Sequence, residues 1–110
     1  MKTGIELITD ERQRQIQLEG WTPKHDDAHN DGSLAMAASC YAIPSSLREY
    51  PTLATHPELW PWDTRWWKPT PNDRIKELVK AGALIAAEID RIQRLKTGDG
   101  QCTLDKSKNS

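Results

Sequence analysis

The sequence predicts an all-α fold, a small bundle of about three helices with a long loop rich in proline and tryptophan. Apolar residues recur at helical spacing in three segments, and no segment alternates convincingly in the manner of a strand. Between the second and third of these segments, residues 44–71 hold six of the seven prolines and four of the five tryptophans. Because proline removes a backbone donor and fixes φ, we expect no long regular element there.

The first helix is predicted over about residues 4–19. Thr3 and Glu6 fit a capping box, in which a hydroxyl and a carboxylate satisfy exposed backbone N–H groups reciprocally. Gly20 is placed to adopt the left-handed turn that often ends a helix. The apolar stripe is thin, so the polar stretch 11–15 faces either solvent or a polar site.

The second helix is predicted over 33–43 and the third over 71–95, with a structured loop at 44–70. Asp31 is suited to cap the second helix. The side chains of this helix are mostly small, which allows another helix to approach closely. Pro71, after a capping Thr70, fits the first position of the third helix. The third helix carries one apolar stripe over five turns: Ile75, Leu78, Val79, Gly82, Ile85, Ala86, Ile89 and Ile92.

Length, charge and hydrophobicity limit the domain organisation, the location and the partners that this protein can have. The chain has 110 residues and a formal net charge of −1, which indicates one domain over residues 1–96 and a flexible polar tail over 97–110. No stretch approaches the ~20 apolar residues of a membrane span, and no apolar segment follows the N-terminus as in a secretory signal, so we expect a cytoplasmic protein without a membrane partner. Near-neutral charge makes nucleic acid an unfavoured partner. Bundles of this size often complete their core by association, so we expect a homo-oligomer.

Histidine and aspartate cluster just before the second helix, at His25, Asp26, Asp27, His29 and Asp31. Carboxylates with imidazoles can hold Mg²⁺, Mn²⁺ or Zn²⁺, which makes Asp26 and Asp27 candidate metal ligands. The alternative, which is the stronger, is that these residues cap and turn the chain, as aspartate and asparagine commonly do before helices.

Four indoles fall within eight residues, in Trp60-Pro61-Trp62 and Trp66-Trp67-Lys68. Indoles stack on flat rings such as nucleobases, and neighbouring cations suit phosphates. In a chain without phenylalanine the same indoles can instead fill the core. The candidate ligand-binding residues are Trp21, His25, His29, Trp60, Trp62, Arg65, Trp66, Trp67 and Lys68.

Motifs along most of the chain, up to Arg94, resemble a group of small phage and prophage proteins. They are Glu11-Arg12-Gln13-Arg14-Gln15, Glu19-Gly20-Trp21-Thr22-Pro23-x-His25-Asp26-Asp27-x-His29, Ala37-Ala38-x-x-Tyr41-Ala42, Trp60-Pro61-Trp62, Trp66-Trp67-Lys68-Pro69 and Leu78-Val79-Lys80-Ala81-Gly82-Ala83-Leu84-Ile85-x-Ala87-Glu88-Ile89-Asp90-Arg91. The resemblance implies a phage origin and the cytoplasm of a host cell, but it implies no activity.

Two more distant resemblances bear on function. The chain is similar to MazG-type all-α nucleoside-triphosphate pyrophosphohydrolases, whose Mg²⁺-binding carboxylates would correspond to Asp26, Asp27, Asp31, Glu88 and Asp90, although the Glu-Glu-x-x-Glu pattern of that family is absent. It also resembles ryanodine-receptor-repeat domains, whose prokaryotic members are thought to recognise nucleotide-derived ligands. This second likeness rests on Gly20-Trp21, His56-Pro57-x-Leu59-x-Pro61-Trp62-Asp63 and Asp73-Arg74.

Three functions therefore compete. The first is a phage-encoded binding protein that holds a nucleotide-like ligand between indoles and sequesters a host defence signal. The second is a metal-dependent all-α nucleotide pyrophosphohydrolase with Mg²⁺ or Mn²⁺. The third is a protein-binding inhibitor of a host defence enzyme or polymerase, with exposed tryptophans as anchors.

Overall fold

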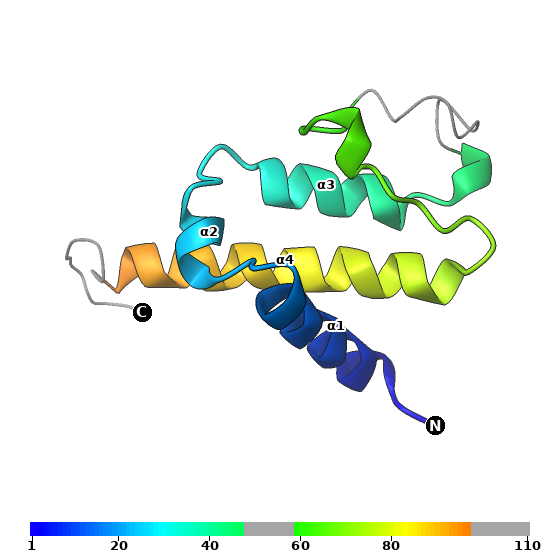
Figure 1. Cartoon of the computed structure of the whole chain (residues 1–110), viewed down its shortest axis with the longest axis horizontal. Coiled ribbons are helices and arrows are strands. Elements are labelled where there is room, and N and C mark those ends of the chain that lie inside the picture. Colours follow the sequence, from blue (N-terminus) through cyan, green and yellow to red (C-terminus); the bar gives the residue numbers. More distant parts are fainter. Residues whose placement is uncertain (48–58, 98–110) are drawn as a thin grey trace.

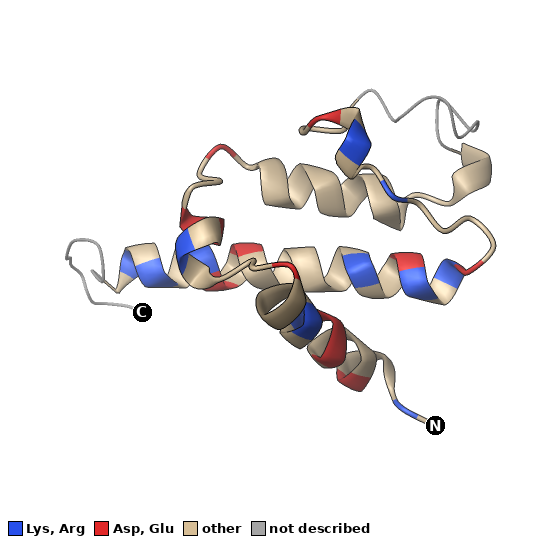
Figure 2. Cartoon of the chain, viewed as in Figure 1, with Lys and Arg blue, Asp and Glu red and all other residues tan. Residues whose placement is uncertain are grey.

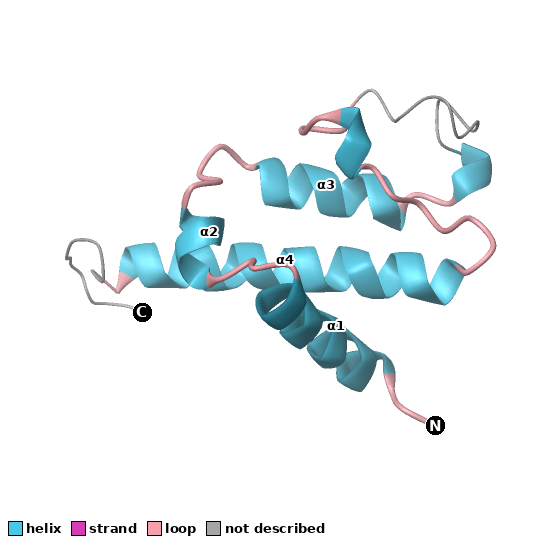
Figure 3. Ribbon diagram, viewed as in Figure 1, coloured by secondary structure: helices cyan, strands magenta, loops and turns pink. Residues whose placement is uncertain are grey.

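The computed structural model describes residues 1–47 and 59–97, and this part of the chain is all-α (Figures 1 and 3). Its helices are α1 (Gly4–Leu18), α2 (Pro23–Asp27), α3 (Ser33–Ala42) and α4 (Arg74–Lys96), with short 3₁₀ turns at Ser45–Leu47 and Thr64–Trp66. The predicted fold class is confirmed. Residues 48–58 of the predicted loop and 98–110 of the predicted tail lie outside the described residues.

Helix α4 is the axis of the molecule, with α3 alongside it and α1 crossing near its middle (Figure 1). At the crossing, a Cβ atom built on Gly82 of α4 would lie 2.5 Å from Cδ1 of Ile8 on α1. The missing side chain at Gly82 therefore lets the two helices approach closely. Figure 2 shows charged residues on α1 and α4, whereas α3 carries none.

The boundaries of α1 follow the signals in the sequence. Thr3 and Glu6 form the predicted capping box, because Glu6 N donates to Thr3 Oγ1 at 3.2 Å and Thr3 N donates to Glu6 Oε1 at 2.8 Å. The helix ends at Leu18, and Gly20 has a φ of 75°, the left-handed value predicted for it.

Helix α2 was not among the three predicted helices, because the histidine and aspartate residues there are expected from the sequence to cap and turn the chain. Thr22 Oγ1 accepts a hydrogen bond from His25 N at 3.3 Å, and Pro23 occupies the first turn. A hydroxyl cap followed by proline is a standard helix start. With five residues, however, α2 is too short to show an apolar repeat.

Helix α3 begins behind Gly32, which has a φ of 84° and supplies no side-chain cap. The predicted cap, Asp31, accepts instead from Ser33 N at 3.1 Å. At the other end, the Arg74 guanidinium donates to the carbonyl oxygens of Tyr41, Ala42 and Ile43. This cation satisfies carbonyls that the helix end leaves unpaired, and it fixes the start of α4 against the end of α3.

Helix α4 begins at Arg74, three residues later than predicted. Its cap is Asp73, whose Oδ1 accepts from Lys76 N at 3.1 Å. Thr70, the predicted cap, donates its backbone N–H to Glu77 Oε2 at 2.9 Å and its hydroxyl to the Asp73 carbonyl. Residues 70–73 therefore form a turn before the helix.

The core consists mainly of small side chains from α3 and α4, closed by aromatic rings. Its buried members are Leu34, Ala37, Ala38, Cys40, Tyr41, Trp60, Ala81, Leu84 and Ala87. Alanine at so many contact positions lets α3 and α4 pack closely.

The opposite face of α4 is apolar and exposed. Leu78, Ile85 and Ile89 are 46%, 48% and 51% exposed, and Ile75 and Ile92 lie on the same stripe. Within the described residues, no helix is long and apolar enough to cross a membrane.

Candidate functional site

A cavity of about 530 Å³ lies between α1, the α2 turn, the core helices and the tryptophan segment 60–68. Its volume falls within the range of roughly 300–1,000 Å³ that is typical of small-molecule sites. Seven aromatic side chains line it: Trp21, His25, His29, Tyr41, Trp60, Trp62 and Trp66. The cavity is therefore walled largely by flat rings.

Four of these rings contact one another in a continuous row. Trp21 and His25 stack nearly parallel, with centroids 5.8 Å apart and 2° between the ring planes. The His25 and His29 centroids are 4.9 Å apart, and those of His29 and Trp62 are 5.2 Å apart. The imidazole-bearing turn and the tryptophan segment therefore form one aromatic wall, although they are about 35 residues apart in sequence.

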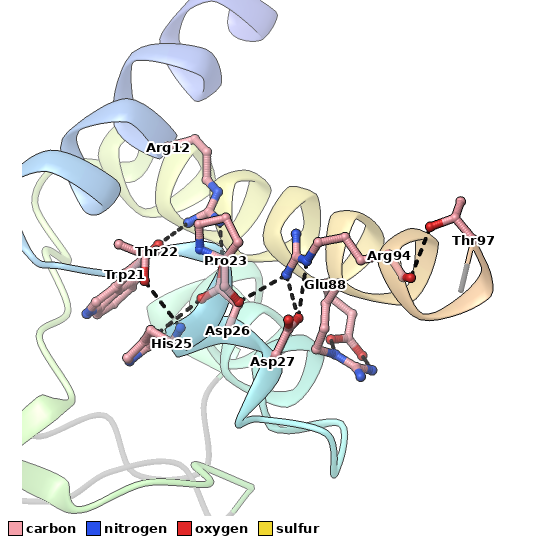
Figure 4. A network of polar contacts seen from close by, with 11 residues as sticks. Arg12, Trp21, Thr22, Pro23, His25, Asp26, Asp27, Glu88, Arg94 and Thr97 are labelled. Atoms are coloured by element: carbon pink, nitrogen blue, oxygen red, sulfur yellow. Dashed lines mark hydrogen bonds and ion pairs between the residues drawn. The ribbon is translucent and has the colours of Figure 1, made fainter. Parts of the chain in front are cut away.

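Helix α2 positions the imidazole end of this wall, as Figure 4 shows. The His25 ring lies beside Trp21, while Asp26 is completely buried and forms an ion pair with Arg12 of α1. Arg12 Nη1 also donates to the Trp21 carbonyl at 3.3 Å. The buried Asp26–Arg12 ion pair thus holds α2 against α1 and fixes the positions of the Trp21 and His25 rings.

The tryptophan end of the wall is anchored on α3. Lys68 N donates to the Tyr41 hydroxyl at 3.1 Å, and Trp60 Nε1 donates to the Asp63 carbonyl at 3.1 Å. Trp60 is 7% exposed and packs edge-on against Tyr41, with centroids 5.6 Å apart. Segment 60–68 is thereby held in place although it contains only one short 3₁₀ turn.

Helix α1 contributes a polar part of the lining: Glu11, Arg14, Gln15 and Glu19. Arg14 Nε and Nη2 donate to the two Glu11 oxygens at 2.9 Å, and Nη1 donates to Glu19 Oε2 at 2.9 Å. Burial raises the pKa of Glu11, but its hydrogen bonds with Arg14 and Gln15 and the nearby charges outweigh burial and leave this pKa below its usual value. Arg14 therefore favours the ionised form of Glu11.

Asp63 and two lysines complete the charged part of the lining. Lys80 Nζ donates to the Lys68 carbonyl at 3.0 Å and lies 4.8 Å from the Tyr41 ring centroid. Burial lowers the pKa of Lys80 because desolvation disfavours its charged form. Lys68 is exposed, with Nζ 5.9 Å from the Trp66 ring.

His29 lies at the centre of the aromatic row. Burial lowers its pKa, and the neighbouring His25 lowers it further, against smaller opposing effects of Asp26 and Asp31. Its Nδ1 lies 3.3 Å from the Ser33 hydroxyl at the start of α3. Near neutral pH the neutral imidazole is therefore favoured, and His29 acts as a flat, uncharged part of the wall.

The cavity brings together seven of the nine residues predicted to bind a ligand: Trp21, His25, His29, Trp60, Trp62, Trp66 and Lys68. Arg65 and Trp67 are not among its lining residues. Trp67 packs into the core, 4.7 Å from Tyr41 and 4.9 Å from Trp60 between centroids. Arg65 is exposed and lies over Trp66, with its guanidinium carbon 5.6 Å from the ring centroid.

The two predicted metal ligands each form an ion pair with an arginine (Figure 4). Asp26 pairs with Arg12, and Asp27 Oδ1 accepts from Arg94 Nη2 at 2.6 Å. Among the described residues, no group of three or more histidine, cysteine, aspartate or glutamate side chains could hold a metal ion. The ion pairs of Asp26 and Asp27 thus join α2 to α1 and to α4.

Sequence reasoning missed the α1 lining, Tyr41 and Lys80. The polar run 11–15 was the one signal for α1, since so many polar residues on a helix with a thin apolar stripe leave room for a polar site. Tyr41 and Lys80 look like an ordinary core aromatic and an ordinary surface lysine, and only the packing of α3 on α4 brings them to the cavity.

Comparison with family models, curated proteins and solved structures finds no match to this chain.

Proposed function

We propose that this protein binds a flat, nucleotide-like molecule that carries negative charge, in the cavity between α1 and segment 60–68. The observation that carries the proposal is the row of rings formed by Trp21, His25, His29 and Trp62 along a cavity of about 530 Å³. Stacking on indoles contributes roughly 1–3 kcal/mol per base in nucleic-acid-binding proteins.

The charges of the lining support a guest with an anionic group. Arg14 is already engaged by Glu11 and Glu19. Lys68 has no carboxylate partner among the described residues, and it lies at the Trp66 side of the cavity. We infer that a phosphate of the guest lies near Lys68, while its ring lies against the aromatic wall.

Binding is favoured over hydrolysis because Glu11, Glu19, Asp26 and Asp27 each form an ion pair with an arginine. Carboxylates engaged in this way are poorly placed to share a divalent cation. The resemblance to phage proteins suggests the biological use, which is sequestration of a nucleotide signal of the host.

A pair of neighbouring cations gives a matched test of binding. The ligand panel contains cyclic dinucleotides, cyclic trinucleotides and ADP-ribose derivatives, titrated by calorimetry. Lys68→Ala should weaken binding about tenfold by removing a charge-assisted contact, whereas Arg65→Ala, outside the cavity, should leave affinity within about twofold. Absence of binding across the panel, or equal losses in both variants, would contradict the proposal.

We also propose that the protein is a homo-oligomer, through the exposed face of α4. Its exposed apolar positions Ile75, Leu78, Ile85, Ile89 and Ile92 are separated by three, four or seven residues, the spacing of helices that pack along one seam. A host protein covering the same face is the alternative partner, and the size of the native particle distinguishes the two.

A further inference from the structure

Two of the residues that line the cavity each carry a buried polar atom without a hydrogen-bond partner among the described residues, namely Gln15 Oε1 and Trp62 Nε1. They belong to opposite types, since the first can only accept a hydrogen bond and the second can only donate one. Leaving such groups unpaired is costly in a folded protein, and exceptions are often functional.

The orientation of the Gln15 amide follows from its surroundings. Its Nε2 donates to Glu11 Oε2 at 3.4 Å, and both Glu11 oxygens are held by Arg14. A flipped amide would place two acceptor oxygens against each other. Gln15 is 0% exposed, so its side chain has no room to turn away, and Oε1 remains as the acceptor.

Trp62 supplies the complementary donor. Its ring is part of the aromatic wall, 5.2 Å from His29 and 5.4 Å from Trp60 between centroids. Whereas Trp60 Nε1 donates to the Asp63 carbonyl, Trp62 Nε1 has no such acceptor in the described part of the chain. The two indoles of Trp60-Pro61-Trp62 therefore differ, and only one has its N–H available.

We propose that the cavity reads the edge of the guest's ring, with Gln15 Oε1 accepting from an N–H of the ring system and Trp62 Nε1 donating to a ring nitrogen or carbonyl oxygen. The ligand class is thus a nucleobase that carries both a donor and an acceptor. A flat aromatic acid without an N–H would stack but would leave Gln15 unpaired. This inference rests on the proposed function and deepens it.

Three pairs of nucleotides that differ in the N–H donor test the inference on the unchanged protein. They are AMP with purine riboside 5′-monophosphate, IMP with its 1-methyl derivative, and UMP with its 3-methyl derivative. We expect the N–H-bearing member of at least one pair to bind about tenfold more tightly or better, because an analogue without the donor leaves a buried acceptor unpaired. Fluorescence of the tryptophans gives the dissociation constants.

Two variants identify the atoms involved. Gln15→Met removes the acceptor at similar side-chain length and should reduce the preference within the pair to below about threefold, whereas Gln17→Met, at an exposed position of α1, should keep it. Trp62→Phe keeps a ring but loses Nε1–H, so it should weaken both members of the pair equally. Circular dichroism establishes whether each variant is folded. If Gln15→Met does not fold, the nucleotide pairs on the unchanged protein and the Trp62→Phe variant test edge recognition.

Equal affinities within every pair, or a preference that survives in Gln15→Met, would overturn edge recognition while leaving ligand binding intact. Failure of all six monophosphates to bind at millimolar concentration would also overturn it. The separate panel of cyclic nucleotides and ADP-ribose derivatives then decides whether the proposed function fails as well.

Discussion

At Asp26 a single carboxylate connects α1 to the α2 turn. Arg12 Nη2 donates to its Oδ2, and His25 Nδ1 lies 3.2 Å from its Oδ1. Because Asp26 is completely buried and Arg12 is 9% exposed, removal of one charge leaves the other unpaired in a poorly solvated place. Trp21 and His25, which begin the aromatic wall, depend on this connection.

Asp26→Asn should lower the free energy of unfolding by about 3 kcal/mol, the magnitude typical of breaking a buried ion pair from one side. Asp27→Asn is the control, because the Asp27–Arg94 pair is partly exposed and should be worth about 1 kcal/mol or less. Urea unfolding followed by circular dichroism measures both. Equal losses in the two variants would show that the Asp26–Arg12 pair has no special role.

The lowered pKa of His29 predicts how stability changes with pH. Its folded-state pKa lies below the ordinary value of 6.5, so the unfolded chain binds the proton more readily. Stability is therefore retained above pH 6.5 and is lost as the pH falls from 6.5 through the folded pKa. NMR titration of the His29 ring should give a midpoint below 6.5, and His29→Gln should reduce the loss of stability in this range. A midpoint at or above 6.5 would contradict the account of burial.

Among the elements, α4 shows what the sequence can and cannot predict. Its apolar stripe can be predicted from residue spacing alone. Spacing does not show, however, whether the stripe packs against this chain's own helices or against another molecule. The buried residues of α4 are instead Glu77, Ala81, Ala83, Leu84 and Ala87, and the small size of the three alanines gives a weak signal. Helix α2 escaped prediction for a related reason, since five residues are too few for periodicity.

The α1–α4 crossing offers a test at Gly82. Alanine normally stabilises a helix by about 1 kcal/mol relative to glycine. Here its Cβ would lie 2.5 Å from Ile8 Cδ1 and 2.8 Å from Cγ1, so Gly82→Ala should instead destabilise the protein by about 1 kcal/mol. Thermal unfolding measures the change.

In an Ile8→Ala background the space above Gly82 is free, and the same Gly82→Ala substitution should then be neutral or stabilising. This double-mutant cycle separates the close approach of the helices from the general effect of glycine. If Gly82→Ala stabilises the protein equally in both backgrounds, then α1 does not cross α4 at this point.

On the scale of the whole molecule, the cavity depends on residues from five parts of the chain: α1, α2 with its flanks, α3, segment 60–68 and α4. Composition and local motifs predicted the two aromatic clusters, because histidine and tryptophan are rare and stand out. They could not predict that α1 would close the cavity with Gln15, or that Trp67 would turn into the core. Those outcomes depend on how α1 crosses α4 and how segment 60–68 is fixed to Tyr41.

The exposed face of α4 predicts the size of the native particle. Native mass spectrometry should find a dimer or higher assembly, because burying half-exposed Leu78, Ile85 and Ile89 is favourable. Ile89→Glu should shift the assembly to monomer, whereas Leu18→Glu, at an exposed position of α1, should not. A monomeric wild-type protein at micromolar concentration would contradict self-association.

The indole N–H signals of the five tryptophans provide the most direct test of the central claim, which is that a flat charged guest binds against the aromatic wall. In two-dimensional ¹H–¹⁵N spectra recorded during titration with the panel of nucleotide-like ligands, the signals of Trp21, Trp62 and Trp66 should move in a saturable manner. The signal of Trp67, outside the cavity lining, should move least. Spectra in which no indole signal moves, or in which Trp67 moves most, would contradict the account.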